Sequence, residues 1–170
     1  MSLELVVGCM FSGKSTEIVR MVDRFKTIDA KYLLVKPQID NRYSMTMVQT
    51  HTNQQRTCEV RRQLLPLFSN QTYIDAEYII IEEAQFFSDL EPFVLKAVDE
   101  DKKNVIVIGL DGDSNRCNFG QIHKLLPVCD NIRKLKAYCL SCKDGTEAIF
   151  SKRIVKQDGQ TCIGAADKYM

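Results

Sequence analysis

Short apolar runs alternate along this chain with segments whose apolar residues follow helical spacing. The first run covers residues 3–7 and stops at Gly8. In the next segment, the apolar positions that fall on one helical face are Ile18, Val19, Val22 and Phe25. This order predicts a strand, a glycine-containing loop and a helix.

Three later runs, at residues 32–35, 78–81 and 105–110, are nearly continuous and rich in β-branched side chains. Runs of this kind are typical of parallel strands that helices cover on both faces. Between the second and third runs, one face of a further helix is marked by Leu90, Phe93, Val94, Ala97 and Val98. We therefore predict an α/β fold in which helices flank a parallel sheet.

The pattern changes near residue 138. From there to the C-terminus the chain contains a C-x-x-C pair, a strand-like run, an Asp-Gly turn signal and a second short strand-like run, at residues 139–142, 148–155, 158–159 and 161–164. Asp-Gly between two strand-like runs is a hairpin signal. We therefore divide the chain into a core of residues 1–136 and a small β appendage of residues 137–170.

Composition narrows the class of protein. Of the 170 residues, 45% are apolar and 26% are charged, and the formal net charge is +1. These values are typical of a globular protein and argue against a disordered tail or a basic nucleic-acid binder. The first apolar run is too short for a signal-peptide core, and no later run approaches the length of a membrane span. We expect a cytoplasmic protein with neither nucleic acid nor membrane as a partner.

Residues 8–15 fit the phosphate-binding pattern G-x-x-x-x-G-K-[ST], with a predicted strand before them and a helix after them. In such a loop, backbone N–H groups and the helix N-terminus face phosphate oxygens. Lys14 would reach the β- and γ-phosphates, and the hydroxyl of Ser15 would ligate Mg²⁺. The alternative is a strand-to-helix turn that matches by chance, and the context argues against it. The predicted phosphate-binding residues are Gly8, Cys9, Met10, Phe11, Ser12, Gly13, Lys14, Ser15 and Thr16.

The strand predicted at residues 78–81 ends in two carboxylates, Glu82 and Glu83. In proteins with a phosphate-binding loop, an acidic strand end lies beside the loop and supports Mg²⁺. Because neighbouring strand residues point to opposite sides, the two carboxylates are expected to have different roles. One would serve the Mg²⁺ shell, and the other would accept the proton of an attacking substrate hydroxyl. The plain alternative is an acidic helix start, which is also common.

Together these motifs resemble those of the type II thymidine kinases, the cellular and poxvirus group. Residues 8–17 resemble the family's G-P-M-F-S-G-K-S-T-E, and residues 81–87 resemble its I-D-E-G-Q-F-F. Five shorter segments occur in the family's order, at residues 40–43, 50–51, 110–112, 118–120 and 166–169. The resemblance therefore extends from one end of the chain to the other.

The resemblance implies a RecA-like P-loop sheet and transfer of the ATP γ-phosphoryl group to the 5′-hydroxyl of thymidine, in pyrimidine deoxynucleotide salvage. Glu83 matches the family's catalytic base, and Glu82 matches the acid that supports Mg²⁺ together with Ser15. Asp40 and Arg42 match a segment near the phosphates. The resemblance also implies a homotetramer and feedback inhibition by thymidine triphosphate, which would span both substrate sites.

The resemblance further implies a pocket for the base. Its expected residues are Met10, Phe86, Leu110, Ser114, Phe119, Cys162, Ile163, Gly164 and Tyr169. Stacking in a flat apolar slot supplies contact area, and backbone hydrogen bonds supply direction. Ser114 departs from the family, which has a substrate-contacting Phe at this position, and Glu82 stands where the family usually has Asp.

The family's structural zinc ion is held by two C-x-x-C pairs, and this chain has only Cys139 and Cys142 in such a pair. Two thiolates fill half of a tetrahedral zinc shell. The second pair would come after Met170, so we interpret the appendage as cut short, by truncation or by natural loss. Less suitably placed substitutes for the missing ligands are Cys58, Cys117, Cys129 and Cys162.

Three other classes share parts of this pattern. A GTPase switch should carry an N-K-x-D-type guanine motif, which the sequence lacks. A DNA-handling ATPase should show a basic stripe or further domains, and the net charge of +1 provides no support for one. A zinc-ribbon interaction module would need the second cysteine pair. The nucleoside kinase interpretation therefore fits the residues best.

Overall fold

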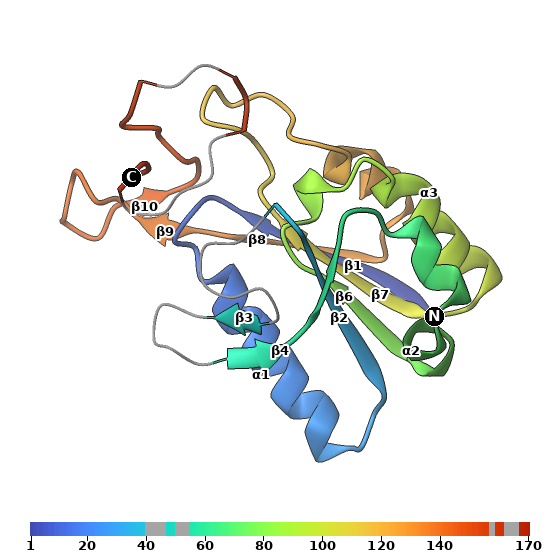
Figure 1. The fold of residues 1–170 in the computed structure, drawn as a ribbon. Coiled ribbons are helices and arrows are strands. Elements are labelled where there is room, and N and C mark those ends of the chain that lie inside the picture. Colours follow the sequence, from blue (N-terminus) through green and yellow to red (C-terminus); the bar gives the residue numbers. More distant parts are fainter. Residues whose placement is uncertain (40–46, 50–54, 157–158, 162–166) are drawn as a thin grey trace.

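A computed structural model describes residues 1–39, 47–49, 55–156, 159–161 and 167–170 of the chain (Figure 1). Its centre is a six-stranded sheet in the order β5-β2-β6-β7-β1-β8, and all neighbouring strands are parallel. In chain order the strands are β1 (Ser2–Gly8), β2 (Tyr32–Pro37), β5 (Glu59–Arg61), β6 (Tyr78–Ile81), β7 (Asn104–Gly109) and β8 (Asn131–Leu135). The predicted parallel sheet is confirmed, and the edge strands β5 and β8 are additional to the prediction.

Helices cover both faces of the sheet, as the apolar runs predict. In chain order the helical segments are α1 (Lys14–Thr27), η1 (Leu65–Ser69), α2 (Gln71–Asp75), η2 (Ala84–Phe86), α3 (Leu90–Leu95), η3 (Lys96–Glu100) and η4 (Ile122–Val128). Successive side chains of a strand enter different cores: Val6 of β1 packs with α1, whereas Leu5 and Val7 join the cluster that includes Phe93 of α3. The α/β prediction is therefore confirmed.

The sheet order brings the candidate chemistry to one edge. The carboxyl ends of parallel strands meet at the same edge of a sheet. Strand β7 lies between β1 and β6, so the segments that leave these three strands are neighbours. They begin at Cys9, Glu82 and Leu110.

Two short hairpins lie outside the main sheet. The first joins β3 (Met47–Gln49) to β4 (Gln55–Thr57) beside α1, where the guanidinium of Arg56 donates to the carboxylate of Asp23. The second joins β9 (Ala137–Tyr138) to β10 (Glu147–Ala148) in the predicted appendage. The hairpin predicted around Asp158 lies partly outside the described residues. Within them, residues 152–154 pair with residues 168–170 through backbone hydrogen bonds.

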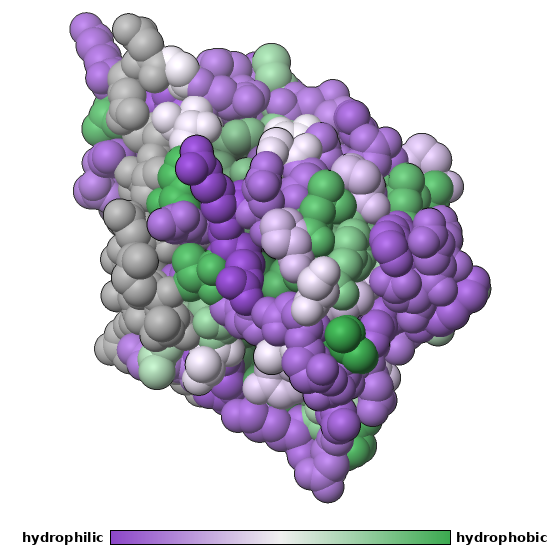
Figure 2. Space-filling model, turned by 45° about the vertical axis from the view of Figure 1, so that its right-hand side comes forward, coloured by the Kyte–Doolittle hydropathy of each residue, from purple (hydrophilic) through white to green (hydrophobic). Residues whose placement is uncertain are grey.

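Hydrophilic side chains predominate on the face shown in Figure 2, and hydrophobic ones form separate patches. Within the described ranges, no helix is long and apolar enough to cross a membrane.

Candidate active site

The segment between β1 and α1 has the form of a phosphate-binding loop. Gly13 has φ +87° immediately before α1, in the left-handed region that glycine adopts without a Cβ penalty. The hydroxyl of Ser12 donates to the backbone carbonyl of Cys9 at 2.8 Å, which closes the loop on itself. The loop therefore leads directly into a helix N-terminus, where backbone N–H groups and the helix dipole favour an anion.

Two side chains of the loop take positions suited to phosphate and metal. The ammonium group of Lys14 folds over the loop and donates to the carbonyls of Gly8 and Cys9 at 3.1 and 2.6 Å. The hydroxyl of Ser15 donates to Oε1 of Glu82 at 3.3 Å, and Glu82 is buried. Hydroxyl and carboxylate oxygens are the donors that Mg²⁺ prefers, so this pair fits the predicted metal role. The predicted phosphate residues Asp40 and Arg42 lie outside the described residues.

The two adjacent carboxylates are directed to different partners, although strand alternation is not the cause. Strand β6 ends at Ile81, and Glu83 adopts φ 48° and ψ 42°, a left-handed conformation that is uncommon for glutamate. Glu82 accepts from Ser15, whereas Oε2 of Glu83 accepts from the side-chain amide of Gln85 at 2.5 Å. A backbone turn therefore separates the carboxylates.

Among the predicted base-pocket residues, Phe86 and Phe119 contact each other directly, and Leu110 and Tyr169 contact other side chains. The rings of Phe86 and Phe119 lie edge to face, with their centroids 5.3 Å apart and their planes at 83°. The backbone N–H of Leu110 donates to the side chain of Gln85, one residue before Phe86. Tyr169 is buried, and the guanidinium of Arg153 lies over its ring. The predicted residues Cys162, Ile163 and Gly164 lie outside the described residues.

A contact that the sequence pattern does not indicate joins the appendage to the phosphate loop. Ser151 is buried, and its hydroxyl accepts from the backbone N–H of Met10 at 2.9 Å. Beside it, the thiol of Cys9 donates to the carbonyl of Ala148 at 3.4 Å. A polar residue inside the strand-like run at residues 148–155 is the only sequence signal at Ser151, and it is a weak one.

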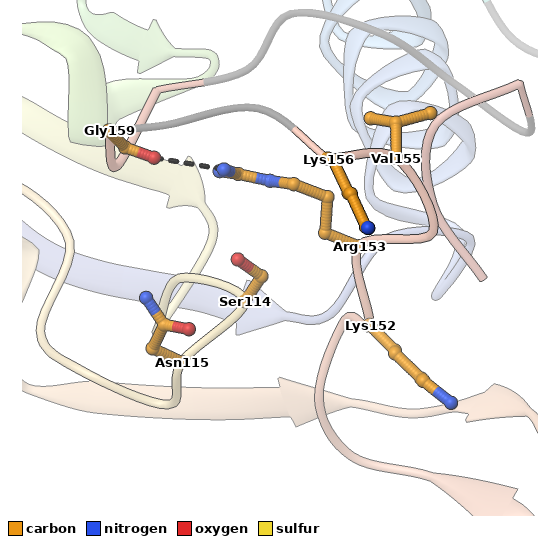
Figure 3. A pocket seen from close by; sticks show the side chains of 7 residues that line it. All are labelled: Ser114, Asn115, Lys152, Arg153, Val155, Lys156 and Gly159. Carbon is orange, nitrogen blue, oxygen red and sulfur yellow. Dashed lines mark hydrogen bonds between the residues drawn. The ribbon is translucent and has the colours of Figure 1, made fainter.

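Ser114 lines a cavity of about 610 Å³ between the loop after β7 and the appendage (Figure 3). The other residues that line it are Asn115, Lys152, Arg153, Val155, Lys156 and Gly159. Three of these seven side chains are cationic, so the cavity favours a negatively charged group. Figure 3 shows the guanidinium of Arg153 reaching across to the carbonyl of Gly159, at 2.9 Å.

A buried carboxylate fixes the wall of this cavity. Asp113 accepts from the backbone N–H groups of Asn115 and Cys117 and from the side-chain amide of Gln160, at 2.8, 2.9 and 2.9 Å. Burial raises the pKa of Asp113, but these hydrogen bonds outweigh it and lower the pKa below its ordinary value. Gln160 thereby ties the appendage to the loop that carries Ser114.

Cys139 and Cys142 form a compact turn in the appendage. The backbone N–H of Cys142 donates to the sulfur of Cys139 at 3.4 Å. This bond and the thiol of Cys142 lower the pKa of Cys139, and the same thiol contact raises the pKa of Cys142. Among the described residues, no group of three or more His, Cys, Asp or Glu side chains is placed to hold a metal ion.

Comparison with known proteins gives one consistent result. A family model described as "Thymidine kinase" matches residues 1–170. The chain is 39% identical over 167 residues to "Thymidine kinase, cytosolic" of Gallus gallus, covering 98% of this chain and 72% of that protein. It is 37% identical over 172 residues to "Thymidine kinase" of Oryza sativa subsp. japonica, covering 99% of this chain and 63% of the relative. It is 38% identical over 168 residues to "Thymidine kinase" of Rabbit fibroma virus (strain Kasza), covering 98% of this chain and 90% of the relative.

Proposed function

The chain belongs to the thymidine kinase family, and on that premise we propose that it transfers the γ-phosphoryl group of ATP to the 5′-hydroxyl of thymidine. The products are thymidine 5′-monophosphate and ADP, in the salvage of pyrimidine deoxynucleotides. The observation that supports this most directly is the contact between Ser15 and Glu82 at 3.3 Å, with Glu83 next in the chain. It brings the helix that follows the phosphate-binding loop into contact with the end of β6, where the two carboxylates follow each other in the chain.

Each of these side chains has a distinct part in the transfer. Ser15 and Glu82 hold Mg²⁺, which arrives with ATP and supplies positive charge to the phosphate oxygens. Lys14 leaves its loop carbonyls and binds the β- and γ-phosphates. Glu83 accepts the proton of the 5′-hydroxyl as that oxygen bonds to the γ-phosphorus and the bond to the β–γ bridging oxygen breaks. The remaining phosphate-loop residues complete the ATP site, together with Asp40 and Arg42, which the resemblance assigns to it and which lie outside the described residues.

The test is an assay of ATP consumption and product formation with thymidine, deoxycytidine or DNA as the stimulant. Thymidine should give stoichiometric ADP and thymidine 5′-monophosphate. Stimulation by DNA without a phosphorylated nucleoside would instead identify a DNA-handling ATPase. Nucleotide hydrolysis that needs none of the three would identify a switch protein.

The base pocket is proposed from the resemblance and from the position of the aromatic pair. Thymidine binds against Phe86 and Phe119, near Met10, Leu110 and Tyr169. The resemblance adds Cys162, Ile163 and Gly164, which lie outside the described residues. Because Ser114 is smaller than the Phe of the family, thymidine analogues with a larger 5-substituent should remain substrates. Equal affinity for thymidine and purine nucleosides in a binding titration would contradict this pocket and leave the kinase chemistry standing.

A structural zinc ion at Cys139 and Cys142 is a separate proposal. The two thiols supply two of the four ligands that such a site needs, and the described residues supply no cluster of three. The remaining ligands would have to come from outside the described residues. Metal analysis of the purified protein tests this, because a stoichiometric zinc ion that is lost in Cys139→Ser would support the site. Absence of zinc from the unaltered protein would reject it.

Three properties of the whole enzyme are proposed from the family alone. The location is cytoplasmic, as the name of the Gallus gallus relative states for that protein. The assembly is a homotetramer, for which Leu126, Val128 and Ile132 offer exposed apolar side chains near β8. Thymidine triphosphate inhibits by occupying both substrate sites. Sedimentation analysis and inhibition kinetics against ATP and thymidine test the last two.

A further inference from the structure

Gln85 belongs to the motif that contains both carboxylates, but the proposed chemistry gives it no role. Its side chain is 4% exposed and lies in η2, two residues after Glu83. Oε1 accepts from the backbone N–H of Leu110 at 3.0 Å, and Nε2 donates to Oε2 of Glu83 at 2.5 Å. One buried amide therefore connects the end of β7 with the carboxylate that comes after β6.

The orientation of this amide is set by its partners. A backbone N–H can only donate, so the oxygen of Gln85 must face Leu110. The NH₂ group then faces Glu83, where an ionised carboxylate is the matching acceptor. If the oxygen and the NH₂ group of Gln85 exchanged places, the NH₂ group would face the N–H of Leu110, and two donors would meet without an acceptor.

The surroundings of Gln85 also restrict its position. A Cβ atom added to Gly109 would lie 2.4 Å from Oε1 of Gln85, so only glycine at the end of β7 allows the amide to approach. Glu83 itself has φ 48°, which costs free energy for a residue other than glycine and is retained only where its surroundings hold it. The bond from Gln85 is one such restraint.

We propose that Gln85 is a positioning residue for the phosphoryl transfer, which fixes the direction of the Glu83 carboxylate relative to the bound nucleoside. The inference rests on the proposed function. Its distinctive feature is that the opposite end of the same amide holds Leu110, a predicted base-pocket residue. The carboxylate of Glu83 is thereby held at a fixed position relative to Leu110, which the base is proposed to contact.

The test is a double-mutant cycle with Gln85→Met and Glu83→Gln. Gln85→Met keeps the length of the side chain and removes both hydrogen bonds, so kcat should fall by about 10- to 100-fold with little change in the KM for ATP. In the Glu83→Gln background no proton acceptor remains to be positioned, so the same substitution should change kcat by less than about twofold. An equal loss in both backgrounds would overturn the proposal and leave Gln85 a structural residue.

Gln121→Met is the matched control. Its amide also makes two hydrogen bonds, in this case both to backbone groups: it accepts from the N–H of Glu91 and donates to the carbonyl of Ser88, at 2.9 and 2.6 Å, and neither partner is Glu83. Its kcat should equal that of the unaltered protein. If Gln121→Met lost as much kcat as Gln85→Met, removal of either glutamine amide would lower kcat, whether or not it contacts Glu83. That result would overturn the proposal.

A second variant covers the case in which Gln85→Met does not fold. Gln85→Glu keeps the size of the side chain and the acceptor for Leu110, but it replaces the donor to Glu83 with a carboxylate. It should show the loss of kcat together with a lower Tm, because a second carboxylate is then buried beside Glu83. Normal kcat of the folded variant would refute the positioning role. If the unaltered protein phosphorylates no nucleoside, the proposed function itself fails. If the unaltered protein phosphorylates thymidine but the losses of kcat in Gln85→Met and Glu83→Gln are additive, only the role of Gln85 is rejected.

Discussion

Residues 1–136 and residues 137–170 keep their structures by different means. In the first region, the four central strands are buried between helices on both faces. In the second, the only buried side chains among the described residues are Ser151 and Tyr169, whereas Tyr138, Phe150 and Ile154 are exposed. Polar contacts with the first region, at Met10 and Asp113, hold the second in place. Substitutions in the first region should therefore alter chemistry directly, and those in the second should act through these contacts.

The largest expected effect lies in the phosphate loop. Lys14→Ala removes the charge that binds the migrating phosphate and should lower turnover by roughly 1,000-fold. The helix after the loop is held by Ile18 and Val22, so thermal unfolding should stay near that of the unaltered protein. Lys26→Ala, at an exposed position of the same helix, is the control and should keep full turnover. Near-normal turnover in Lys14→Ala would remove the loop from the mechanism.

The next effect separates the two carboxylates. Glu83→Gln keeps size and hydrogen bonding but cannot take a proton, so kcat should fall by roughly 100-fold with ATP and thymidine affinity little changed. Glu82→Gln should instead weaken the apparent affinity for Mg²⁺, because Glu82 acts through the metal shell with Ser15. Steady-state kinetics over a range of Mg²⁺ concentrations measures both.

Excess Mg²⁺ should restore part of the activity of Glu82→Gln and none of that of Glu83→Gln. Rescue at Glu83 alone would reverse the two assignments. Full activity in both variants would exclude the carboxylate pair from the reaction.

The sequence predicts the first region well because its signals are local. Hydrophobic runs define the buried strands, and a glycine before Lys14 defines the loop, since both depend on neighbouring residues alone. The edge strand β8 is not predicted, because its side chains are exposed or only half-buried and form no apolar run. A local pattern also does not predict that Glu82 contacts Ser15, which is 67 positions away in the sequence. Nor does it predict the left-handed turn at Glu83, because glutamate rarely adopts that conformation.

In the second region, residues 137–170, local sequence signals predict the structure poorly. The strand-like run predicted at residues 148–155 is not a buried strand, because Ile149, Phe150 and Ile154 are exposed. Ser151, in the middle of that run, is buried because it meets Met10 across 141 positions of sequence. Contacts of this kind depend on the completed core and leave no periodic signal, so the sequence indicates the cysteine pair and the change of pattern but not the contacts.

An intermediate effect is expected where the two regions meet. Ser151→Ala leaves the half-buried backbone N–H of Met10 without its acceptor, which costs about 1 kcal/mol. The KM for thymidine should rise about tenfold with a smaller change in kcat, because the contact fixes a predicted pocket residue. Ser151→Thr keeps the hydroxyl and should restore most of the affinity, and Ser141→Ala, which is exposed, should change nothing. An unaltered KM in Ser151→Ala would mean that the appendage does not shape the pocket.

The smallest effect contrasts an ion-paired carboxylate from each region. Glu17 of α1 accepts from Arg20 and Arg133, and its side chain is 14% exposed. Glu147 of β10 pairs with Lys136 and is 57% exposed. At pH 7, Glu17→Gln should lower Tm by about 2–4 °C for a network worth ~1 kcal/mol. Glu147→Gln should leave Tm within about 1 °C, because water screens the exposed pair.

The dependence on pH identifies the origin of this difference. The hydrogen bond from Arg20, aided by Arg133, outweighs burial and lowers the pKa of Glu17 from 4.5 to about 2 in the folded protein. A carboxyl whose pKa is lower when folded stabilises the protein fully above its unfolded pKa, and that stabilisation is lost as the pH falls through the folded pKa. The Tm difference between the unaltered protein and Glu17→Gln should therefore be constant from about pH 7 to pH 5 and should disappear near pH 2. A difference that persists at about pH 2 would assign the loss to packing around Glu17, and an equal loss in Glu147→Gln would remove the contrast between the regions.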